Sequence, residues 1–336
     1  MRMAAEMAEQ PEVIDRLLAR REAVLAELRA AMPAEPLGVV LVARGSSDNA
    51  AVYGRYLLAL ATRRPVALAA PSLHTLYGGE FDLRGYLVVA ASQSGETPEI
   101  VSTFASLVRA GGVGIAVTND AGSALGEVAP LVVELEAGPE RAVPATKTFT
   151  AQLAAFALIA EAAGPVAHRP DELATVGDAV RAVLDDPEPS RQAAARLAGA
   201  TGLIVVGRGF LYAVALEAAL KLKEAALVLA EGCSAADVRH GPIAVLERDF
   251  PVLALSAPGA AAADMEALFA ELGGRGVAPL HVGVEPGADL PIPAGAETLA
   301  PFPPAVRAQQ LALELALARG IDPDHPAGLA KVTPTR

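Results

Sequence analysis

The stretch VVLVARG, residues 39–45, recurs as LIVVGRG, residues 203–209, so the glycines that end the two runs lie 164 positions apart. The same offset aligns two further apolar runs, LVVAAS with PVLALS and GIAVTND with APLHVGV. Agreement of three strand-like runs in one register indicates an internal duplication. The sequence therefore predicts two copies of one unit built from strands and helices.

Within the first copy, short apolar runs alternate with longer stretches of helical spacing. The runs predicted to be strands are residues 39–43, 65–69, 86–90, 114–118 and 131–135. Both faces of these runs are apolar, which is typical of a parallel sheet covered by helices on both sides. The stretch TPEIVSTFASLVRAGG is predicted to be a helix that Thr97 caps and that ends at Gly111 and Gly112.

The segments around the two copies predict helices and a tail. We expect one or two helices over residues 6–31 and a linking helix over residues 171–185. The boundary between the copies is expected at DDPEPS, residues 185–190. Residues after Ile321 carry prolines and little periodicity, so they are expected to form an extended tail.

Composition narrows the class of protein. The chain has 336 residues, which predicts two domains, and its net charge of −12 argues against nucleic acid, whose backbone calls for a basic face. No apolar run approaches the roughly 20 residues that span a bilayer, and the acidic opening is unlike a signal peptide, so no membrane partner is expected. The single cysteine, Cys233, is expected to be inert and fits a reducing, cytoplasmic location.

Hydroxyl side chains gather after two predicted strands of the first copy. Ser46 and Ser47 follow the first strand, and Ser92, Ser94 and Thr97 follow the third. Ligands of open parallel sheets bind at these strand ends, where helix N-termini attract anions, so we predict a phosphate site. The alternative is that serine and threonine only stabilise turns and caps. Because the nucleotide motifs G-x-x-x-x-G-K-[ST] and G-x-G-x-x-G are missing, the phosphate is expected on a small metabolite.

A second group of ionisable residues lies in the second copy, in LEAALKLKEAAL. Glu217, Lys221 and Glu224 stand at i, i+4 and i+7 and share one helix face, whereas Lys223 points away. One interpretation is a surface ion pair. The other follows from the surrounding alanine and leucine, which suit a half-buried face. Burial disfavours a charged carboxylate, so a glutamate placed there could exchange protons near neutral pH.

The remaining ionisable candidates lie on a loop and near the end of the chain. His240 precedes a Gly-Pro turn, and Lys331 stands among small and apolar residues of a tail that is expected to pack down. No pair of histidines or carboxylates has metal-ligand spacing, so no metal site is expected. The other histidines are expected to be structural: His74, His168, His281 and His325.

Several motifs, taken in chain order, resemble the isomerase half of glucosamine-6-phosphate synthase, which is built of two sugar isomerase (SIS) domains. They are RGSS, SQSGET, ATKTFTAQ, LEAALKLKE, RHGP and GLAKVTPTR. The resemblance implies an α/β fold of two tandem SIS domains, each a parallel sheet flanked by helices in a flavodoxin-like or Rossmann-like three-layer sandwich. It divides the chain into a helical segment (1–36), a first SIS domain (37–165), a linking helix (166–195), a second SIS domain (196–320) and a tail (321–336).

The resemblance also implies roles for individual residues. Glu224 is similar to the base that moves a proton between C1 and C2, and His240 to the group that assists ring opening from a second subunit of a homodimer. Lys331 is similar to the lysine beside the sugar carbonyl. The implied substrate and phosphate contacts are Ser46, Ser47, Ser92, Gln93, Ser94, Thr97, Val143, Glu217 and Lys221.

The implied activity is aldose–ketose isomerisation of a hexose or hexosamine 6-phosphate, with glucosamine 6-phosphate giving fructose 6-phosphate and ammonia as the first expectation. Such chemistry needs one base and no metal or redox cofactor, and the lysine could polarise the carbonyl or form a Schiff base. The alternatives are a simple ketose/aldose phosphosugar isomerase, a fructosamine-phosphate-processing enzyme and a non-catalytic phosphosugar-binding regulator.

The chain departs from the synthase pattern in three places. Residue 2 is Arg2, where the synthase has the nucleophilic cysteine of its glutaminase domain, so no glutaminase activity is expected. Ala145 replaces a serine and removes one hydroxyl from the expected sugar contacts. The tail KVTPTR is similar to that of stand-alone SIS deaminases and isomerases of amino-sugar catabolism.

Overall fold

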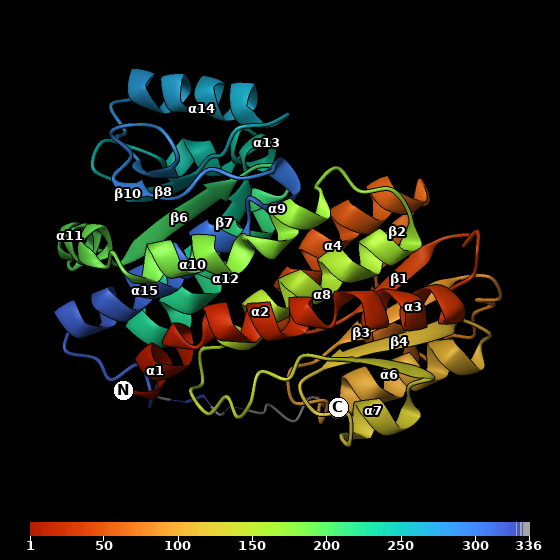
Figure 1. The fold of residues 1–336 in the computed structure, drawn as a ribbon. Coiled ribbons are helices and arrows are strands. Elements are labelled where there is room, and N and C mark those ends of the chain that lie inside the picture. The colour runs from red at the N-terminus through yellow and green to blue at the C-terminus, as the bar shows by residue number, and fades with distance from the viewer. Residues whose placement is uncertain (327, 330, 332–336) are drawn as a thin grey trace. The chain divides into compact units, whose positions relative to one another are not determined.

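The computed structural model describes residues 1–326, 328, 329 and 331, and it divides into two compact units. The first-copy unit comprises residues 12–140 and 147–167, with Lys331 from the tail. The second-copy unit comprises residues 1–11 and 141–146 and the described residues of 168–329. Each unit is built around one five-stranded sheet (Figure 1).

The sheet of the first-copy unit is parallel throughout and has the order β2-β1-β3-β4-β5. In its register, Val40 of β1 pairs with Ala67 of β2 and with Val88 of β3. The strands confirm the five predicted runs: β1 (Val39–Val42), β2 (Val66–Leu68), β3 (Leu87–Ala91), β4 (Val113–Thr118) and β5 (Leu131–Glu134).

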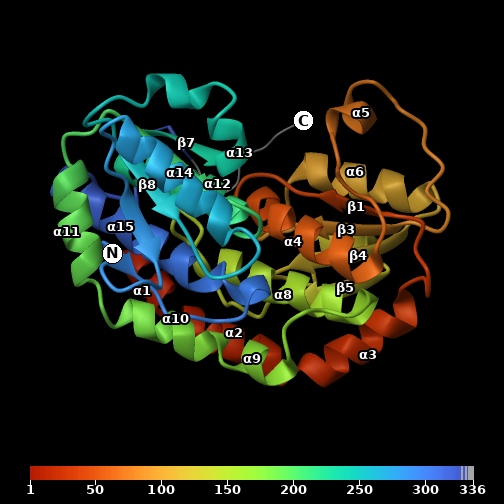
Figure 2. The same ribbon diagram turned by 90° about the horizontal axis from the view of Figure 1, so that it is seen from above.

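Helices cover both faces of this sheet, as the apolar runs predicted (Figure 2). On one face, α4 (Ser46–Thr62) packs against α8 (Lys147–Ala163), which also contacts α3 (Arg21–Ala31). On the other face, α6 (Pro98–Arg109) packs with α5 (Ser72–Thr75) and α7 (Ala124–Val128). Phe104 of α6 is fully buried in the core that these elements form with the sheet. The α8 residues from Lys147 to Ala160 are all buried, which suits its apolar sequence.

The sheet of the second-copy unit repeats the first one. Its parallel strands have the order β10-β9-β8-β6-β7, which is the same as that of the first sheet once the strands are numbered from the start of each copy. The bounds are β6 (Gly202–Gly207), β7 (Leu229–Ser234), β8 (Val252–Leu255), β9 (Leu280–Gly283) and β10 (Leu290–Pro291). The predicted fold class and the predicted duplication are therefore confirmed.

In the second-copy unit, α12 (Leu211–Ala226) and α15 (Phe302–Ala318) pack closely together, and α15 also contacts α10 (Val176–Leu184) and α11 (Glu188–Leu197). A buried arginine, Arg307, fixes α15 by donating to the carbonyls of Pro291 and Asp186. The other helical elements are α1 (Arg2–Ala8), α9 (Pro170–Ala174), α13 (Ala235–Val238), η1 (Pro242–Val245), α14 (Ala262–Gly274) and η2 (Glu297–Leu299).

Three sequence-based expectations about helices were wrong in detail. Residues 2–31 form three helices rather than one or two: α1, α2 (Gln10–Ala19) and α3. Pro11 in the first turn of α2 lacks an N–H, which favours a new helix start at that point. The expected linking helix is divided at Thr175 into α9 and α10. Thr97 stands at the N-cap of α6 and its carbonyl accepts the Ile100 N–H, but its side chain makes no capping bond.

None of the helices in the described part of the chain combines the length and the apolar character needed to cross a bilayer. The predicted domain boundaries stay predictions.

Candidate active site

The order of the first sheet creates a switch point between β1 and β3, because the chain leaves these neighbouring strands in opposite directions. Helix α4 begins at Ser46, just after β1, and α6 begins at Pro98, just after β3. Since Val42 pairs with Ala90, the two strands end side by side. The N–H groups and the positive dipole ends of both helices therefore meet at one edge of the sheet.

We use the name hydroxyl cradle for the polar groups at this edge: Ser46, Ser47, Ser92, Gln93, Ser94 and Thr97. Ser47 is buried, and its Oγ accepts a hydrogen bond from Gln152 Nε2 at 2.9 Å. Ser92 is also buried, and its Oγ accepts the Gly95 N–H at 3.2 Å. The Ser94 Oγ accepts the Glu96 N–H at 3.2 Å. The structure thus brings the predicted phosphate residues of each loop to the switch point.

The turn after β3 requires a glycine. Gly95 has a φ of +65°, in the left-handed region, and a Cβ at this position would lie 2.0 Å from Ser123 Oγ. The close approach allows the Gly95 carbonyl to accept the Leu125 N–H at 2.9 Å, at the start of α7. Gly95 therefore fixes the path of the loop that carries Ser92 and Ser94.

An ion pair that the sequence did not predict joins the two cradle loops. Arg44, between β1 and α4, donates from Nε to Glu99 Oε2 at 3.0 Å and from Nη2 to Glu99 Oε1 at 3.1 Å. Glu99 is buried in the first turn of α6. Two parallel bonds of this kind fix orientation as well as distance. The RGSS motif contains Arg44, but nothing local in the sequence indicates its partner.

On α12 in the second-copy unit, Glu217, Lys221 and Glu224 share one face, as predicted. The Lys221 ammonium lies 3.4 Å from Glu217 Oε1 and contacts Glu224 Oε2 directly. The side chains of Lys221 and Glu217 are 0% and 1% exposed, so the alternative of a surface ion pair is wrong. Glu224 is 18% exposed, which leaves its carboxylate within reach of a ligand. Lys223 is exposed, as expected for a residue that points away.

The other predicted site residues of the second-copy unit are more exposed. His240 lies in the turn after α13, and its N–H donates to the Asp237 carbonyl at 2.9 Å. Val143 and Ala145 are partly buried in the segment 141–146. His240 and Val143 therefore keep their assignments as predictions, with no further contact to support them.

In the first-copy unit, Lys331 is held by Glu140, which is not among the predicted site residues. Its Nζ lies 2.9 Å from Oε2 of Glu140, whose side chain is fully buried. Glu140 also accepts the Thr148 N–H at 3.2 Å and the Thr148 hydroxyl at 2.6 Å, both in the first turn of α8. This contact agrees with the expected packing of the tail at Lys331, whereas Leu329 is exposed, so the packing of the tail as a whole stays a prediction. The rest of GLAKVTPTR, apart from Gly328 and Leu329, lies outside the described residues.

The second copy has an ion pair like that of the hydroxyl cradle, but a side chain of the chain itself occupies the corresponding helix N-terminus. Arg208 Nε lies 2.9 Å from Asp264 Oδ2, in the first turn of α14, which matches the pair at Arg44. However, the Ala260 N–H near the start of α14 donates to the Glu297 carboxylate at 2.8 Å. Because a carboxylate of the chain already neutralises this helix N-terminus, the second copy is poorly suited to bind a phosphate.

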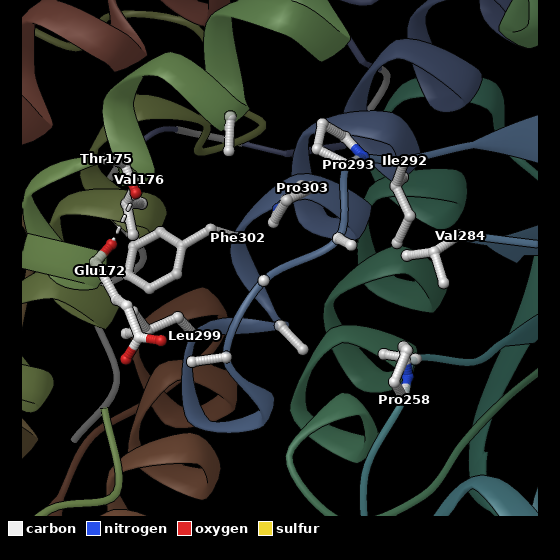
Figure 3. A pocket seen from close by; sticks show the side chains of 16 residues that line it. Glu172, Thr175, Val176, Pro258, Val284, Ile292, Pro293, Leu299, Phe302 and Pro303 are labelled. Atoms are coloured by element: carbon white, nitrogen blue, oxygen red, sulfur yellow. Dashed lines mark hydrogen bonds between the residues drawn. The ribbon is translucent and has the colours of Figure 1, made fainter. Parts of the chain in front are cut away.

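A separate cavity of about 320 Å³ lies in the second-copy unit (Figure 3). Apolar side chains such as Val284, Ile292 and Phe302 line it, and Glu172 is the one ionisable side chain among the described residues around it. A cavity with a carboxylate and no cation disfavours a phosphorylated ligand. This cavity is therefore a poor candidate for the predicted phosphate site.

The cysteine and the histidines outside the predicted site make contacts that suit a structural role. Burial raises the pKa of the Cys233 thiol to about 11, with further contributions from Glu231 and Asp237, which supports the inert interpretation. The described residues include no cluster of three or more His, Cys, Asp and Glu side chains that could hold a metal ion. The histidines predicted to be structural contact neighbouring side chains: His74 with Phe81, His168 with Thr298, His281 with Ser256, and His325 with Asp322.

Comparison with known proteins adds to this geometry. A glutamine–fructose-6-phosphate aminotransferase (isomerizing) from Gloeobacter violaceus is 34% identical over 98% of this chain, and one from Thermococcus kodakarensis is 32% identical over 98%. The chain spans 58% and 57% of the lengths of these relatives. The predicted resemblance to the isomerase half of such enzymes is confirmed.

Solved structures agree on the fold. A Silicibacter pomeroyi protein provisionally assigned as a phosphosugar isomerase is 32% identical, with a TM-score of 0.87 over 96% of this chain and 100% of its own. The C-terminal domain of glucosamine-fructose-6-phosphate aminotransferase from Francisella tularensis shares the fold at 23% identity, with a TM-score of 0.86 over 97% of this chain and 98% of its own.

The SIS domain pattern itself matches twice, at residues 38–162 and 196–317, and each match contains one of the two sheets. The chain therefore belongs to the SIS domain family.

Proposed function

We propose that the chain is a phosphosugar isomerase that converts glucosamine 6-phosphate into fructose 6-phosphate and ammonia. The observation that carries the proposal is the partly exposed Glu224 carboxylate, which a fully buried lysine fixes from one side. Such a carboxylate can take and return a proton while its position stays constant. The SIS family and the hydroxyl cradle supply the second requirement, a site for the sugar phosphate.

Phosphate binding is assigned to the hydroxyl cradle. Hydroxyl and backbone N–H donors at two helix N-termini suit a phosphate dianion without a dedicated lysine. Gln152 and Gly95 hold Ser47 and Ser92 by hydrogen bonds, so the donors are ordered before a ligand binds. Preorganised donors lower the cost of binding, because less side-chain freedom is lost.

Proton transfer is assigned to Glu224. In the opened sugar, the carboxylate would take the proton from C2 and return it to C1, while a second proton passes from the C2 amine to the C1 oxygen. The aldehyde thereby becomes a hydroxymethyl group and the amine at C2 becomes an imine. Water would then add to C2, and ammonia would leave, which balances the reaction. His240 of a second copy would move the proton that opens the ring, and Lys331 would lie beside the carbonyl.

A homodimer is part of the proposal. Around α5 of the first-copy unit, Leu76 and Tyr77 are strongly exposed, and Leu73 and Phe81 nearby are also exposed. A cluster of large apolar side chains on the surface is typical of a protein–protein contact. The cluster supports association, and sedimentation of the purified chain would measure it.

The test is a coupled assay over a panel of hexose phosphates. Glucosamine 6-phosphate should release ammonia, whereas galactosamine, glucose and fructosamine phosphates should react more slowly. Glu224→Gln should lower kcat by about 100- to 10,000-fold, the range for loss of a general base. Glu266→Gln, which changes an exposed carboxylate on α14, is the matched control and should keep full activity. Binding of hexose phosphates without turnover would instead indicate a regulator.

A further inference from the structure

Resting on the proposed function, we propose that Glu140 is a positioning residue that holds Lys331 in place for the reaction. Glu140 stands five positions before the ATKTFTAQ motif but belongs to none of the candidate site residues, and it lies 191 positions before Lys331. No substrate contact is assigned to it. Its role follows from what it binds on each side.

Both carboxylate oxygens of Glu140 are engaged. Oε1 accepts the Thr148 N–H, and Oε2 accepts both the Thr148 hydroxyl at 2.6 Å and the Lys331 ammonium at 2.9 Å. The Glu140 side chain is 0% exposed, and that of Lys331 is 21% exposed. The carboxylate is thus fixed by the helix, whereas the lysine side chain stays partly exposed. An ammonium has three N–H donors, so two can still bind a substrate oxygen.

The same helix also orders the hydroxyl cradle. Thr148 and Gln152 lie four residues apart on α8, so their side chains share one face. Thr148 orients Glu140, and Gln152 Nε2 donates to Ser47 Oγ at 2.9 Å. The buried part of one helix therefore positions both the Ser47 hydroxyl of the cradle and the carboxylate that holds the lysine. Fixing a lysine side chain costs conformational entropy. Because Glu140 already orders Lys331 in the free protein, less of this entropy is lost when the substrate binds.

A purely structural role is the competing explanation, because Glu140 also caps the first turn of α8. The two roles predict different results. A cap lost from α8 would lower the melting temperature without acting through Lys331. A positioning residue should change the reactivity of the Lys331 amine, and its effect on turnover should disappear once Lys331 is removed.

The first measurement is the acetylation rate of Lys331 relative to the exposed Lys223, read by mass spectrometry on the native chain with acetic anhydride. Glu140→Gln should raise this ratio roughly tenfold, by analogy with the loss of one charge-assisted hydrogen bond. Glu127→Gln, at an exposed position on α7, should leave it unchanged. This readout needs no substrate, so it decides the contact even if no hexose phosphate is turned over and the proposed function fails.

The second measurement is a double-mutant cycle in the phosphosugar assay. Glu140→Gln should lower kcat roughly 10- to 100-fold with little change in KM, because the phosphate stays held by the cradle. In a Lys331→Met background the same change should have no further effect. If Glu140→Gln fails to fold, Thr148→Val replaces it, with Thr148→Ser as the variant that restores the hydroxyl. An unchanged acetylation ratio, or an equal loss of kcat with and without Lys331, would overturn the proposal.

Discussion

The guanidinium of Arg44 donates two hydrogen bonds to the carboxylate of Glu99, at 3.0 and 3.1 Å, and so joins the two loops that carry the hydroxyl cradle. Arg208 and Asp264 form the corresponding pair in the second copy, at 2.9 Å. The pair is therefore a feature of the duplicated scaffold, whereas the hydroxyls differ between the copies. In the first copy, the pair fixes the distance between the loops after β1 and β3, to which we assign phosphate binding.

Replacing Arg44 with Met should weaken substrate binding. Glu99 is buried but Arg44 is half exposed, so the loss in unfolding free energy should be about 1–2 kcal/mol, between the values for surface and buried ion pairs. The loops would lose their fixed spacing, and KM for the sugar phosphate should rise roughly tenfold. Arg208→Met is the control: it should destabilise the chain and leave KM unchanged. Equal effects of both variants on KM would contradict the assignment.

A methyl group at Gly95 should disrupt the cradle. The new Cβ would meet Ser123 Oγ at 2.0 Å, and the left-handed φ adds backbone strain. Together these should cost roughly 2–4 kcal/mol, with a large rise in KM. Gly138→Ala isolates the clash, since Gly138 has a nearly equal φ of +66° and no atom within 4 Å of its added Cβ. Gly95→Ala should have a lower melting temperature and a higher KM than Gly138→Ala. Similar values for the two variants would show that the loop relieves the clash and would contradict the prediction.

Removing the buried cation on α12 should be costly. Lys221→Met leaves Glu217 as a buried carboxylate next to an apolar chain, and breaking a buried pair in this way costs about 3–5 kcal/mol. Adding Glu217→Gln should recover part of that loss. The exposed Lys223→Met should change the free energy of unfolding by less than about 0.5 kcal/mol. Urea unfolding measures all three, and a Lys221→Met variant as stable as Lys223→Met would refute the burial of the charge.

The Cys233 thiol should react slowly in the native protein. Burial raises its pKa from 9.0 to about 11. Below pH 9 both the folded and the unfolded chain keep the proton; between pH 9 and 11 only the folded chain keeps it, so stability falls as pH rises through this window. Iodoacetamide should therefore modify the native protein at pH 8 roughly 100-fold more slowly than the protein in urea. Equal rates would show an accessible thiolate.

Much of the fold could be predicted, because it depends on local patterns. The five strands of the first sheet are short apolar runs between turn residues. The glycines of ARG and GRG align the second copy with the first, so its strands could be predicted from the same pattern. The helix breaks at Glu9 and Thr175 could not be predicted, since the periodicity continues across them. They depend on packing in the folded chain, which a sequence pattern does not contain.

The site could be predicted only in part, and for a related reason. The shared face of Glu217 and Lys221 follows from helical spacing, and the strand-end serines follow from the order of elements. The residues that hold them are distant in sequence: 55 positions separate Arg44 from Glu99, and 105 separate Ser47 from Gln152. Nothing local indicates such pairs, because the contact exists only once the sheet has formed.

The central claim is that the Glu224 carboxylate carries a proton between C1 and C2 of a sugar phosphate. It is tested most directly by incubating the chain with fructose 6-phosphate and an ammonium salt in deuterium oxide and following deuterium at C1 by NMR. The native chain should incorporate deuterium, because a carboxylate exchanges the proton with solvent during transfer, and Glu224→Gln should lower the rate by about 100-fold or more. Incorporation at an equal rate in both proteins would contradict the account.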